Sequence, residues 1–344
     1  MCREHLSNRK PFLTIAAALI LACCPALGHA ITISWSTVGN PGNAPDPATG
    51  RQYGAVNYIY NIGTYDVTTG QYTAFLNAVA ATDTYGLWNS NMATGFNGDG
   101  LSACGITQNG SSGSYTYSVS RNPNFPVNYT SFGDAARFAN WLQNGQPTGP
   151  EGPGTTETGA YTLNGAVTDA ALLAVTRNAN ATIFLPSENE WYKAAYYDGT
   201  NGTYWTYPTQ NISVPSNVLS ATGTNNANFH TTVYTDPANY LTPVGAFVSS
   251  PGPYGTYDMG GDMFQWNEGI VDSSSRSVRG GSYFGGSQTL ESSFRGDALP
   301  SIDLDDSLGF RVAGLPVPEP ATWLLATIGA SGLWFARRRQ RSPV

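Results

Sequence analysis

The sequence of 344 residues has little charge, few cysteines and few histidines. Charged residues make up 11% of it, and there are 4 cysteines and 3 histidines. Beyond residue 30 only Cys104 and His230 remain of these two residue types. A single cysteine excludes an intrachain disulfide and any site that needs two thiolates. A catalytic thiol needs a nearby base, which could only be His230, and the Gly/Ser/Asn-rich surroundings of Cys104 argue against such a pair.

Basic residues are also scarce. Residues 31–316 contain 9 Lys or Arg and 21 Asp or Glu, a formal charge of −12 (9 − 21). Nucleic acids and anionic membrane surfaces are poor partners for such a chain, whereas divalent cations suit it. Glycine (39) and tyrosine (20) are abundant, together with Asn and Thr. This composition is typical of a loop-rich secreted or envelope protein.

The first 30 residues have the pattern of a secretory signal peptide. Basic residues between positions 3 and 10 precede an apolar run over 12–27, and the small residues around 28–30 form a cleavage site. Two alternatives are an uncleaved membrane anchor and a lipoprotein signal at Cys23.

The C-terminus combines a short motif, an apolar stretch and a basic end. Pro318-Glu319-Pro320 precedes the apolar residues 321–336, a little short for a transmembrane helix, and the arginines 337–339 would stay cytoplasmic. This order resembles the PEP-CTERM sorting signal, here taken as residues 317–341. The resemblance implies that an exosortase, a membrane transpeptidase, recognises the tripeptide. It also implies export across the inner membrane, anchoring until the tail is removed, and delivery to the cell surface or extracellular matrix. A plain membrane anchor is the alternative.

Three helices are predicted from apolar periodicity and capping residues. Residues 66–79 have an apolar helical face with a threonine cap at the start. A second helix is predicted to begin near Ser131. A third is predicted to begin at Ser187, where Glu190 would complete a capping box.

The rest of the segment 31–316 predicts short strands and long loops. Residues 53–62 are typical of a strand, and residues 31–50 of a coil or edge strand. No repeat or linker divides the segment, so we expect one α+β domain. Stretches without periodicity are predicted as loops: 83–120, 144–160 and 198–257.

A series of short motifs runs in order through residues 53–313. The motifs are 65–68 (YDVT), 71–76, 126–128 (PVN), 185–191 (LPSENEW), 257–266, 279–283 (RGGSY), 295–296 and 308–313 (LGFRVA). Their order resembles that of the formylglycine-generating enzyme (FGE)/sulfatase-modifying factor family. The resemblance implies an α+β fold, the FGE-type variant of the C-type lectin fold, which is loop-rich with little regular secondary structure.

Most of the motif residues are expected to have structural roles. Four aromatic residues are predicted to fill the core: Trp191, Trp266, Phe284 and Phe310. Three arginines are predicted to tie loops together through forked hydrogen bonds: Arg279, Arg295 and Arg311. Gly280 and Gly281 are expected to permit tight or positive-φ backbone.

The chain lacks the thiols that the family's chemistry needs. Active members oxidise a substrate cysteine with copper held by a cysteine pair between the RGGS and GFR motifs. The corresponding interval here, residues 282–308, contains no cysteine. Thiolates select Cu(I), so no copper is expected. Another branch uses histidine-bound iron and an added helical domain. With His230 alone, no iron is expected either.

The resemblance also implies two structural calcium sites built from oxygen ligands. The first maps to Asn228, the carbonyl of Phe229, Asp236 and the carbonyl of Ala238. The second maps to Asp258, the carbonyls of Gly261 and Met263, and Gln265. At the second site Asp258 stands where Asn is common, and Gln265 where Glu is usual. Alternatively, these two side chains bond to loop amides. The acidic run at 303–306 is interpreted as a solvated loop.

Together these features favour an exported, surface- or matrix-sorted protein whose FGE-like domain is a non-catalytic recognition or scaffold module. Its expected partners are an exosortase and an extracellular polysaccharide or matrix protein. One alternative is an oxidoreductase of the sulfatase-modifying factor superfamily that acts through an unrecognised site. The other is a structural protein tethered by an uncleaved tail.

Overall fold

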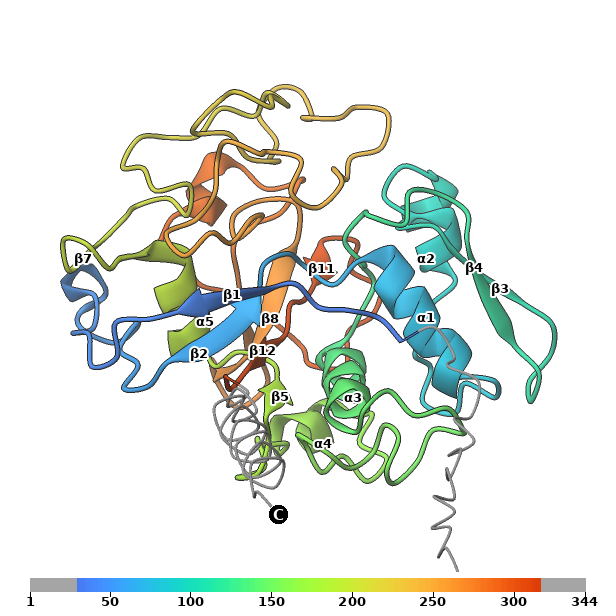
Figure 1. The fold of residues 1–344 in the computed structure, drawn as a ribbon. Coiled ribbons are helices and arrows are strands. Elements are labelled where there is room, and N and C mark those ends of the chain that lie inside the picture. The colour runs from blue at the N-terminus through green and yellow to red at the C-terminus, as the bar shows by residue number, and fades with distance from the viewer. Residues whose placement is uncertain (1–29, 317–344) are drawn as a thin grey trace, which may run out of the picture.

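The computed structural model describes residues 30–316, in which short helices and strands are joined by long loops (Figure 1). The α-helices are α1 (Thr69–Val79), α2 (Asn91–Thr94), α3 (Phe132–Gln143), α4 (Asp169–Leu173) and α5 (Glu188–Tyr196). The strands are β1 (Trp35–Val38), β2 (Tyr60–Gly63), β3 (Ile106–Asn109), β4 (Thr116–Val119), β5 (Ile183–Phe184), β6 (Tyr197–Asp198), β7 (Thr203–Tyr204), β8 (Phe264–Ile270), β9 (Arg276–Arg279), β10 (Gly296–Ala298), β11 (Leu308–Gly309) and β12 (Ala313–Gly314).

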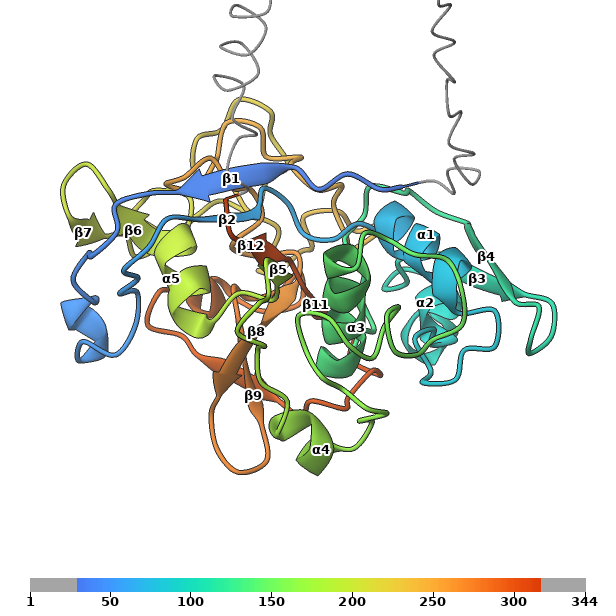
Figure 2. The same cartoon turned by 60° about the horizontal axis from the view of Figure 1, so that its bottom comes forward.

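Two four-stranded sheets organise the chain. Their strand orders are β1-β2-β12-β5 and β10-β9-β8-β11, and β3-β4 and β6-β7 form separate two-stranded sheets. In the first sheet β12 pairs antiparallel with both β2 and β5, so Ala313 lies opposite Ile62 and Phe184. Figure 2 shows this sheet between α5 and α3. The last described residues therefore join segments that are far apart in the sequence.

The three predicted helix starts are confirmed, because each begins at a capping box. Thr68 caps α1, Ser131 caps α3 and Ser187 caps α5. In α5 the Ser187 hydroxyl accepts from the Glu190 amide at 3.2 Å, and the Glu190 carboxylate accepts from the Ser187 amide at 2.6 Å. These reciprocal bonds satisfy backbone groups that the first turn of a helix leaves unpaired.

Three predictions of regular structure need correction, one of them because the predicted loop 198–257 contains β7, which pairs with β6. The strand predicted over 53–62 begins only at Tyr60, since the preceding residues form a loop in which Gly54 has a φ of 96°. The predicted loop 83–120 contains α2 and the β3-β4 hairpin. This hairpin is held against α1 by Asn77, which donates to the Tyr117 carbonyl at 2.8 Å and accepts from its amide at 2.9 Å. A contact with a distant helix, rather than local propensity, supports the hairpin.

The main hydrophobic core draws buried residues from Val38 to Ala313. Among the described residues this core is continuous from the first sheet to the last strand, as expected of a domain that folds as one unit. Its centre is a cluster of aromatic rings that packs α1 and α3 against the segment after β11, with centroids 5.3 to 6.3 Å apart. The cluster consists of Tyr72, Phe75, Phe138, Trp141 and Phe310.

The prediction that the motif aromatics fill the core is confirmed for three of the four. Trp191, Trp266 and Phe310 are fully buried, but Phe284 is 66% exposed. Its neighbour Tyr283 is buried, at 1% exposure. The two residues lie at the centre of a turn that the Gly285 amide closes by donating to the Ser282 carbonyl at 3.1 Å, and the turn leaves Tyr283 inside and Phe284 at the surface.

The predicted role of the motif arginines is confirmed. Arg311 donates to the Gly63 carbonyl at 2.8 Å, the Asp66 carboxylate at 3.1 Å and the Tyr257 carbonyl at 2.9 Å, which joins three segments. Arg279 and Arg295 both contact the Glu188 carboxylate, each at 2.7 Å. These ion pairs fix α5 against the second sheet.

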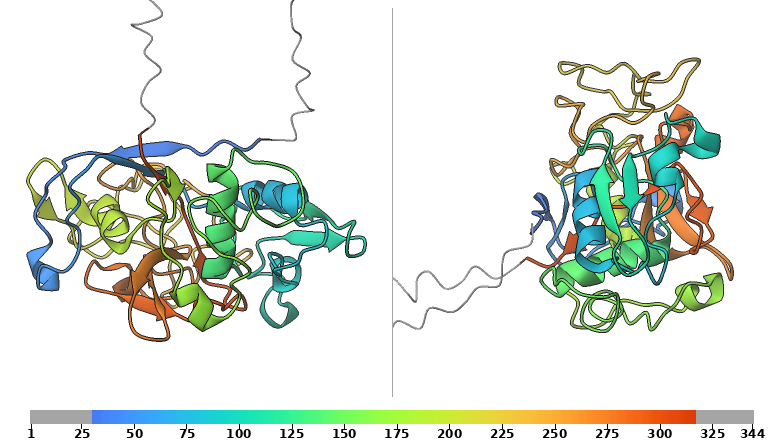
Figure 3. Two further views of the ribbon diagram at one scale, coloured as in Figure 1. Left: turned by 90° about the horizontal axis from the view of Figure 1, so that it is seen from below. Right: turned by 90° about the vertical axis from the view of Figure 1, so that its right-hand side faces the viewer.

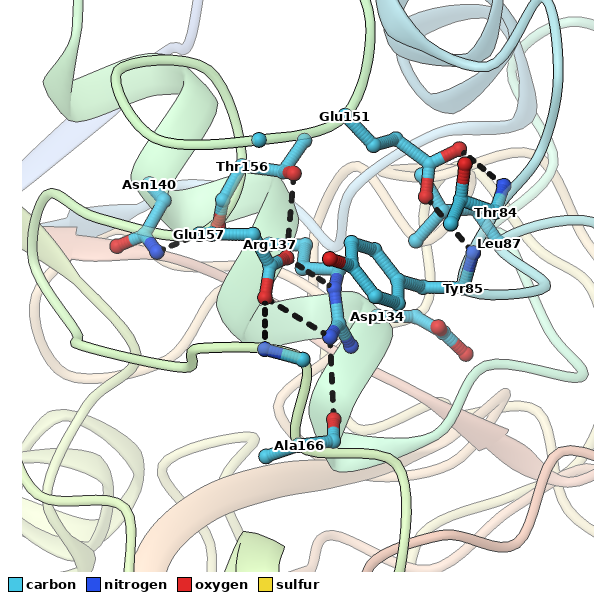
Figure 4. A network of polar contacts seen from close by, with 12 residues as sticks. Thr84, Tyr85, Leu87, Asp134, Arg137, Asn140, Glu151, Thr156, Glu157 and Ala166 are labelled. Atoms are coloured by element: carbon cyan, nitrogen blue, oxygen red, sulfur yellow. Dashed lines mark hydrogen bonds and ion pairs between the residues drawn. The ribbon is translucent and has the colours of Figure 1, made fainter.

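A buried ion pair fixes the loop that follows α3 (Figure 4). Arg137 Nε donates to Glu157 Oε1 at 2.7 Å, and both side chains are at most 3% exposed. The guanidinium also lies over the ring of Tyr85, 4.3 Å from its centroid. Nearby, Glu151 accepts from the amides of Thr84 and Tyr85 at 2.9 and 3.0 Å. A few strong polar contacts thus hold the loop 144–160, which has no regular secondary structure.

The predicted signal peptide and the sorting tripeptide Pro318, Glu319 and Pro320 lie outside the described residues. The predicted transmembrane stretch at 321–336 lies outside them as well. Among residues 30–316, no helix combines the length and apolar character that a membrane crossing requires.

Candidate functional site

The interval in which the family places its copper ligands, residues 282–308, is well ordered and contains no thiol. It starts at the buried Ser282 and Tyr283 and continues through a 3-10 helix, Ser287–Leu290, into β10. Leu290 is fully buried and packs with Tyr207, Ala227 and Phe229 in a second, smaller core. Apolar packing and main-chain turns occupy this interval, and no side chain in it can bind Cu(I) as a thiolate does.

Residues of this interval, together with Phe96, line a groove of about 340 Å³ that combines apolar side chains with two carboxylates. It is lined by Phe96, Phe284, Ile302, Leu304, Asp305 and Asp306. Phe284, Leu304 and Phe96 are 66, 60 and 53% exposed. Such exposure of large apolar side chains in a concave surface is typical of a binding site. We call it the 284 groove.

The two carboxylates of the 284 groove differ in their surroundings. Asp305 accepts from the amide and the hydroxyl of Ser307, at 2.8 and 2.6 Å, and so closes its own turn. Burial raises the pKa of Asp306, and a hydrogen bond with Tyr283 opposes that shift. The acidic run is therefore only partly a solvated loop, because Asp306 faces buried tyrosine.

A larger cavity of about 630 Å³ lies between the N-terminal segment and α1. Small, aliphatic and neutral polar side chains line it together with Trp141, and none of its described lining residues is titratable.

The structure brings the residues of the first predicted calcium site into one region. Thr235, next to Asp236, donates to the carbonyl of Phe229 at 3.4 Å. The side-chain nitrogen Nδ2 of Asn228 donates to the carbonyl of Tyr240 at 2.9 Å, so the two ends of this loop lie close together. The Asp236 carboxylate accepts from the amide of Ala238 at 2.9 Å.

One atom of this first site fits a cation. Asn228 is 1% exposed, and its Oδ1 is a buried oxygen without a hydrogen-bond partner. Its Nδ2 is fixed by Tyr240 and by Asp262 Oδ1 at 3.1 Å, which sets the orientation of the amide. A buried, unpaired carbonyl oxygen costs free energy unless a donor or a cation satisfies it. Calcium, which prefers oxygen ligands, would supply that interaction.

The second predicted site is arranged differently. Gln265 Oε1 already accepts from Trp191 Nε1 at 2.6 Å and from Arg311 Nε at 2.7 Å. The side chain of Asp258 accepts from the amide of Gly245 at 2.6 Å, and the Asp258 carbonyl accepts from Gln265 Nε2 at 2.7 Å. A cation here would have to displace one of these donors from Gln265. Asp236 of the first site also accepts three hydrogen bonds, from the backbone amides of Ala238 and Asn239 and from the Asn239 side chain. The unpaired Oδ1 of Asn228 is therefore what favours the first site, and hydrogen bonding alone accounts for Gln265.

The main-chain ligands predicted for the second site lie in the same turn. The Gly261 carbonyl accepts from the amide of Met263 at 2.8 Å, and Met263 is fully buried. Gly261 has a φ of 86°, and a Cβ at this position would lie 2.2 Å from the Asn228 carbonyl oxygen. Only glycine permits this close approach, so the backbone of Gly261 at the second predicted site lies against the backbone of Asn228 at the first.

Sequence reasoning missed two buried carboxyl groups in this region, Asp66 and Asp262. Burial raises the pKa of Asp66 to about 8 against the opposing effect of Arg311, and it raises that of Asp258 to about 6. Burial also raises the pKa of Asp262, whose carboxyl accepts from the Thr242 hydroxyl at 2.6 Å. Both residues lie inside family motifs, but one aspartate in a motif does not reveal burial.

These carboxyl groups do not form a metal centre of their own. Within the part of the chain that the structure describes, no three His, Cys, Asp or Glu side chains are placed to hold one metal ion. The first predicted calcium site would depend instead on amide and main-chain oxygens with a single carboxylate, Asp236.

Cys104 and His230 have separate surroundings. Cys104 is fully buried, its sulfur lies 3.8 Å from the Met92 carbonyl, and burial raises its pKa to about 11. His230 packs against the ring of Tyr234, 4.5 Å between centroids, and its amide donates to the Gly285 carbonyl. A protonated, inaccessible thiol is neither a nucleophile nor available for a disulfide between chains.

Comparisons with known proteins agree with this geometry. Residues 47–314 match the sequence profile of the sulfatase-modifying factor enzyme 1-like domain, and residues 316–340 match that of the PEP-CTERM protein-sorting motif. A search of curated proteins finds no match. The sorting motif indicates export and surface sorting, and it implies processing by an exosortase.

Solved structures show a similar fold. CarF is 20% identical, with a TM-score of 0.50 over 83% of this chain and 99% of CarF. Treponema denticola variable protein 1 is 18% identical, with a TM-score of 0.49 over 84% of this chain and 97% of its own. PvdO from Pseudomonas aeruginosa is 18% identical, with a TM-score of 0.45 over 83% of this chain and 92% of its own. The likeness to CarF supports the loop-rich α+β fold of C-type lectin type.

The profile match covers most of the chain, the motifs occupy the positions described above, and the interval for copper-binding thiols is filled by apolar packing. This chain belongs to the FGE-sulfatase (sulfatase-modifying factor enzyme 1-like) domain family and carries a PEP-CTERM protein-sorting motif.

Proposed function

We propose that this exported protein is a non-catalytic recognition module of the FGE-sulfatase family. The observation that carries the proposal lies in the interval 282–308. Where the family's chemistry requires two thiolates, this chain has none, and Leu290 is sealed in a hydrophobic core. In the same interval Phe284 is 66% exposed at the 284 groove. The interval thus presents an exposed aromatic side chain at a groove and contains no thiolate for copper.

The ligand that best suits the 284 groove is a neutral extracellular polysaccharide. The exposed ring of Phe284 offers a flat apolar surface, and the carboxylates of Asp305 and Asp306 line the same groove and can accept from hydroxyl groups. The formal charge of −12 over residues 31–316 disfavours anionic polymers. Delivery to the cell surface would place the 284 groove next to matrix polymers.

Calcium at the first site would serve this function structurally. Asn228, the Phe229 carbonyl, Asp236 and the Ala238 carbonyl would hold the ion, which would cross-link two loop segments without taking part in chemistry. The unpaired Oδ1 of Asn228 supports this assignment. Calcium at Asp258 and Gln265 stays a weaker proposal, because Gln265 is already saturated with donors.

Metal analysis of the purified segment 31–316 tests the non-catalytic assignment. We expect about one equivalent of calcium, no stoichiometric copper or iron, and a melting temperature that falls in chelator and recovers with calcium. Asn228→Ala should abolish the calcium-dependent part of the melt, whereas Gln265→Ala should leave it in place. Stoichiometric copper or iron, or oxidation of a cysteine-containing peptide by the pure protein, would establish an oxidoreductase instead.

Binding to immobilised neutral polysaccharides tests the 284 groove. Phe284→Ala should lower affinity at least about tenfold, equivalent to about 1.4 kcal/mol. Val167→Ala is the control, because Val167 is a 49% exposed apolar residue outside the groove. Equal loss in both variants, or retention of binding by Phe284→Ala, would contradict the assignment of the groove.

A further inference from the structure

The cavity of about 630 Å³ beside α1 shares no lining residue with the 284 groove or with either predicted calcium site. Its wall is formed by α1, by β4, by α3 with the loop that follows it, and by the residues ahead of β1. Small-molecule sites in proteins have volumes of about 300–1,000 Å³ and are lined mainly by apolar and aromatic side chains with a few polar groups. The size and the composition of this cavity both fall within that description.

The cavity arises because the part of α1 that lines it carries short side chains. Ala74 and Ala78 are one helical turn apart on the same face of α1, and both line the cavity together with Gly70. Trp141 of α3 lines the same cavity and is 2% exposed. Its Nε1 donates to the Pro147 carbonyl at 2.9 Å, so the polar atom of the indole is satisfied and its carbon atoms remain for a ligand.

Polar side chains of the lining are bonded within the protein. Gln146 Oε1 accepts from the Ile31 amide at 2.7 Å, and Gln146 Nε2 donates to the Ile31 carbonyl at 2.9 Å. The Thr73 hydroxyl donates to the Thr69 carbonyl at 2.7 Å, and Asn77 holds the β3-β4 hairpin as described above. Because none of the described lining residues is titratable, a charged ligand would lose its hydration here without gaining an ionic partner.

The cavity connects the interior of the domain to its surface. Among the residues that line it, Thr73 and Trp141 are buried, whereas Asn77 and Thr148 are exposed. A ligand can therefore enter from solvent and still reach the buried indole ring.

The segment ahead of β1, residues 30–34, forms one side of the cavity. Gln146 holds Ile31 through the two hydrogen bonds given above, and Gln71 Nε2 donates to the Thr32 carbonyl at 2.9 Å. Ile31 also packs against the main core. Figure 3 (left) shows this segment running past α3 and α1. This side of the cavity is therefore fixed in place before a ligand binds, as in most small-molecule sites.

We propose that this cavity binds a neutral, predominantly apolar small molecule. Apolar cavities in proteins take up apolar molecules such as benzene. The formal charge of −12 over residues 31–316 repels anionic amphiphiles, and the described lining residues offer no carboxylate to a cation. The cavity is separate from the 284 groove, so this proposal does not depend on polysaccharide recognition.

Fluorescence titration of the whole chain with N-phenylnaphthylamine, a neutral probe that brightens in apolar surroundings, tests the proposal. We expect saturable binding of about one probe per chain. The anionic analogue anilinonaphthalene sulfonate should bind at least about tenfold more weakly, because its sulfonate finds no cation among the described lining residues.

A variant that fills the cavity provides the second arm. Ala74→Leu combined with Ala78→Leu keeps good helix formers in α1 and should weaken binding of the neutral probe at least about tenfold, because the larger side chains occupy its space. Ala93→Leu is the matched control, since Ala93 is a half-buried alanine of α2 that does not line the cavity. Uptake of the probe by apolar stretches at the chain ends is common to all variants.

Three results would overturn the assignment. One is a neutral probe that does not bind saturably. Another is binding that the double leucine variant leaves unchanged, or that Ala93→Leu weakens equally. The third is a sulfonate that binds as tightly as the neutral probe. A thermal melt of each variant shows whether it is folded, and if the double variant unfolds, Ala78→Leu alone decides. Polysaccharide binding at the 284 groove is measured separately, so either proposal can fail alone.

Discussion

The buried ion pair between Arg137 and Glu157 provides the sharpest test of how the loop after α3 is held. The Glu157 carboxylate accepts from Arg137 Nε at 2.7 Å, from Arg137 Nη2 at 3.3 Å and from the amide of Gly165 at 2.7 Å. Arg137 Nη2 also donates to the Ala166 carbonyl at 3.1 Å. The perturbation is Glu157→Gln, which keeps the shape of the side chain and removes its charge.

The expected cost follows from burial. The side chains of Arg137 and Glu157 are 1% and 3% exposed, so the substitution leaves a guanidinium charge without a counterion in the interior. Removing one partner of a buried pair typically costs about 3–5 kcal/mol. The new amide group also places a donor against either Arg137 or the Gly165 amide. Removing both charges, as in Arg137→Met with Glu157→Leu, should cost less than the sum of the single changes by about 1–3 kcal/mol.

Urea unfolding of residues 31–316 gives the free energy of unfolding for each variant. Glu151→Gln is the matched control, because Glu151 lies in the same network but binds two backbone amides and no cation. The control should lose about 1 kcal/mol or less. The reasoning is refuted if Glu157→Gln also loses less than about 1 kcal/mol, which is the range of exposed ion pairs.

Three further predictions concern pH, backbone conformation and the thiol. Burial raises the pKa of Asp134 to about 7, so the folded protein holds a proton on this carboxyl more tightly than the unfolded chain does. This proton stabilises the fold fully below the ordinary carboxyl pKa of about 4, and the stabilisation is lost as pH rises through 7. The free energy of unfolding should therefore fall by about 1.4 kcal/mol per pH unit for this proton between pH 5 and 7, and Asp134→Asn should flatten that slope in urea titrations at each pH. Gly280 has a φ of 101°, and a Cβ there would lie 2.7 Å from the Met259 carbonyl oxygen, whereas Gly113 has a φ of 93° with open space around it. Gly280→Ala should therefore lower the melting temperature more than Gly113→Ala, and equal shifts would contradict the steric argument. Cys104 should resist alkylation in the native protein and react fully in urea, as mass spectrometry would show; rapid native labelling would contradict its burial.

The starts of α1, α3 and α5 were predictable from the sequence because their determinants are local, whereas the short helices α2 and α4 were not predicted. Thr68, Ser131 and Ser187 each precede a partner residue three positions later, and the capping boxes form within one turn. The β3-β4 hairpin was not predictable in this way. It depends on Asn77, which is 40 residues from Tyr117, and nothing in the local pattern shows that contact.

The candidate site was predictable in residue type but not in geometry. Resemblance placed Asn228 and Gln265 at two calcium sites, yet the free oxygen of Asn228 and the saturated oxygen of Gln265 distinguish them only in three dimensions. The core assignment of Phe284 was wrong for a related reason. Tyr283 and Phe284 are both large aromatics, and only the turn that they form in three dimensions shows which of the two is buried.

The place of β12 in its sheet has a consequence for removal of the tail. Ala313 and Gly314 complete a sheet with β2 and β5, on segments about 250 and 130 residues earlier. The sorting motif at 316–340 begins directly after this strand. Removal of the tail at the motif therefore leaves β12 in the chain, whereas a cut a few residues earlier would remove the strand that joins β2 to β5.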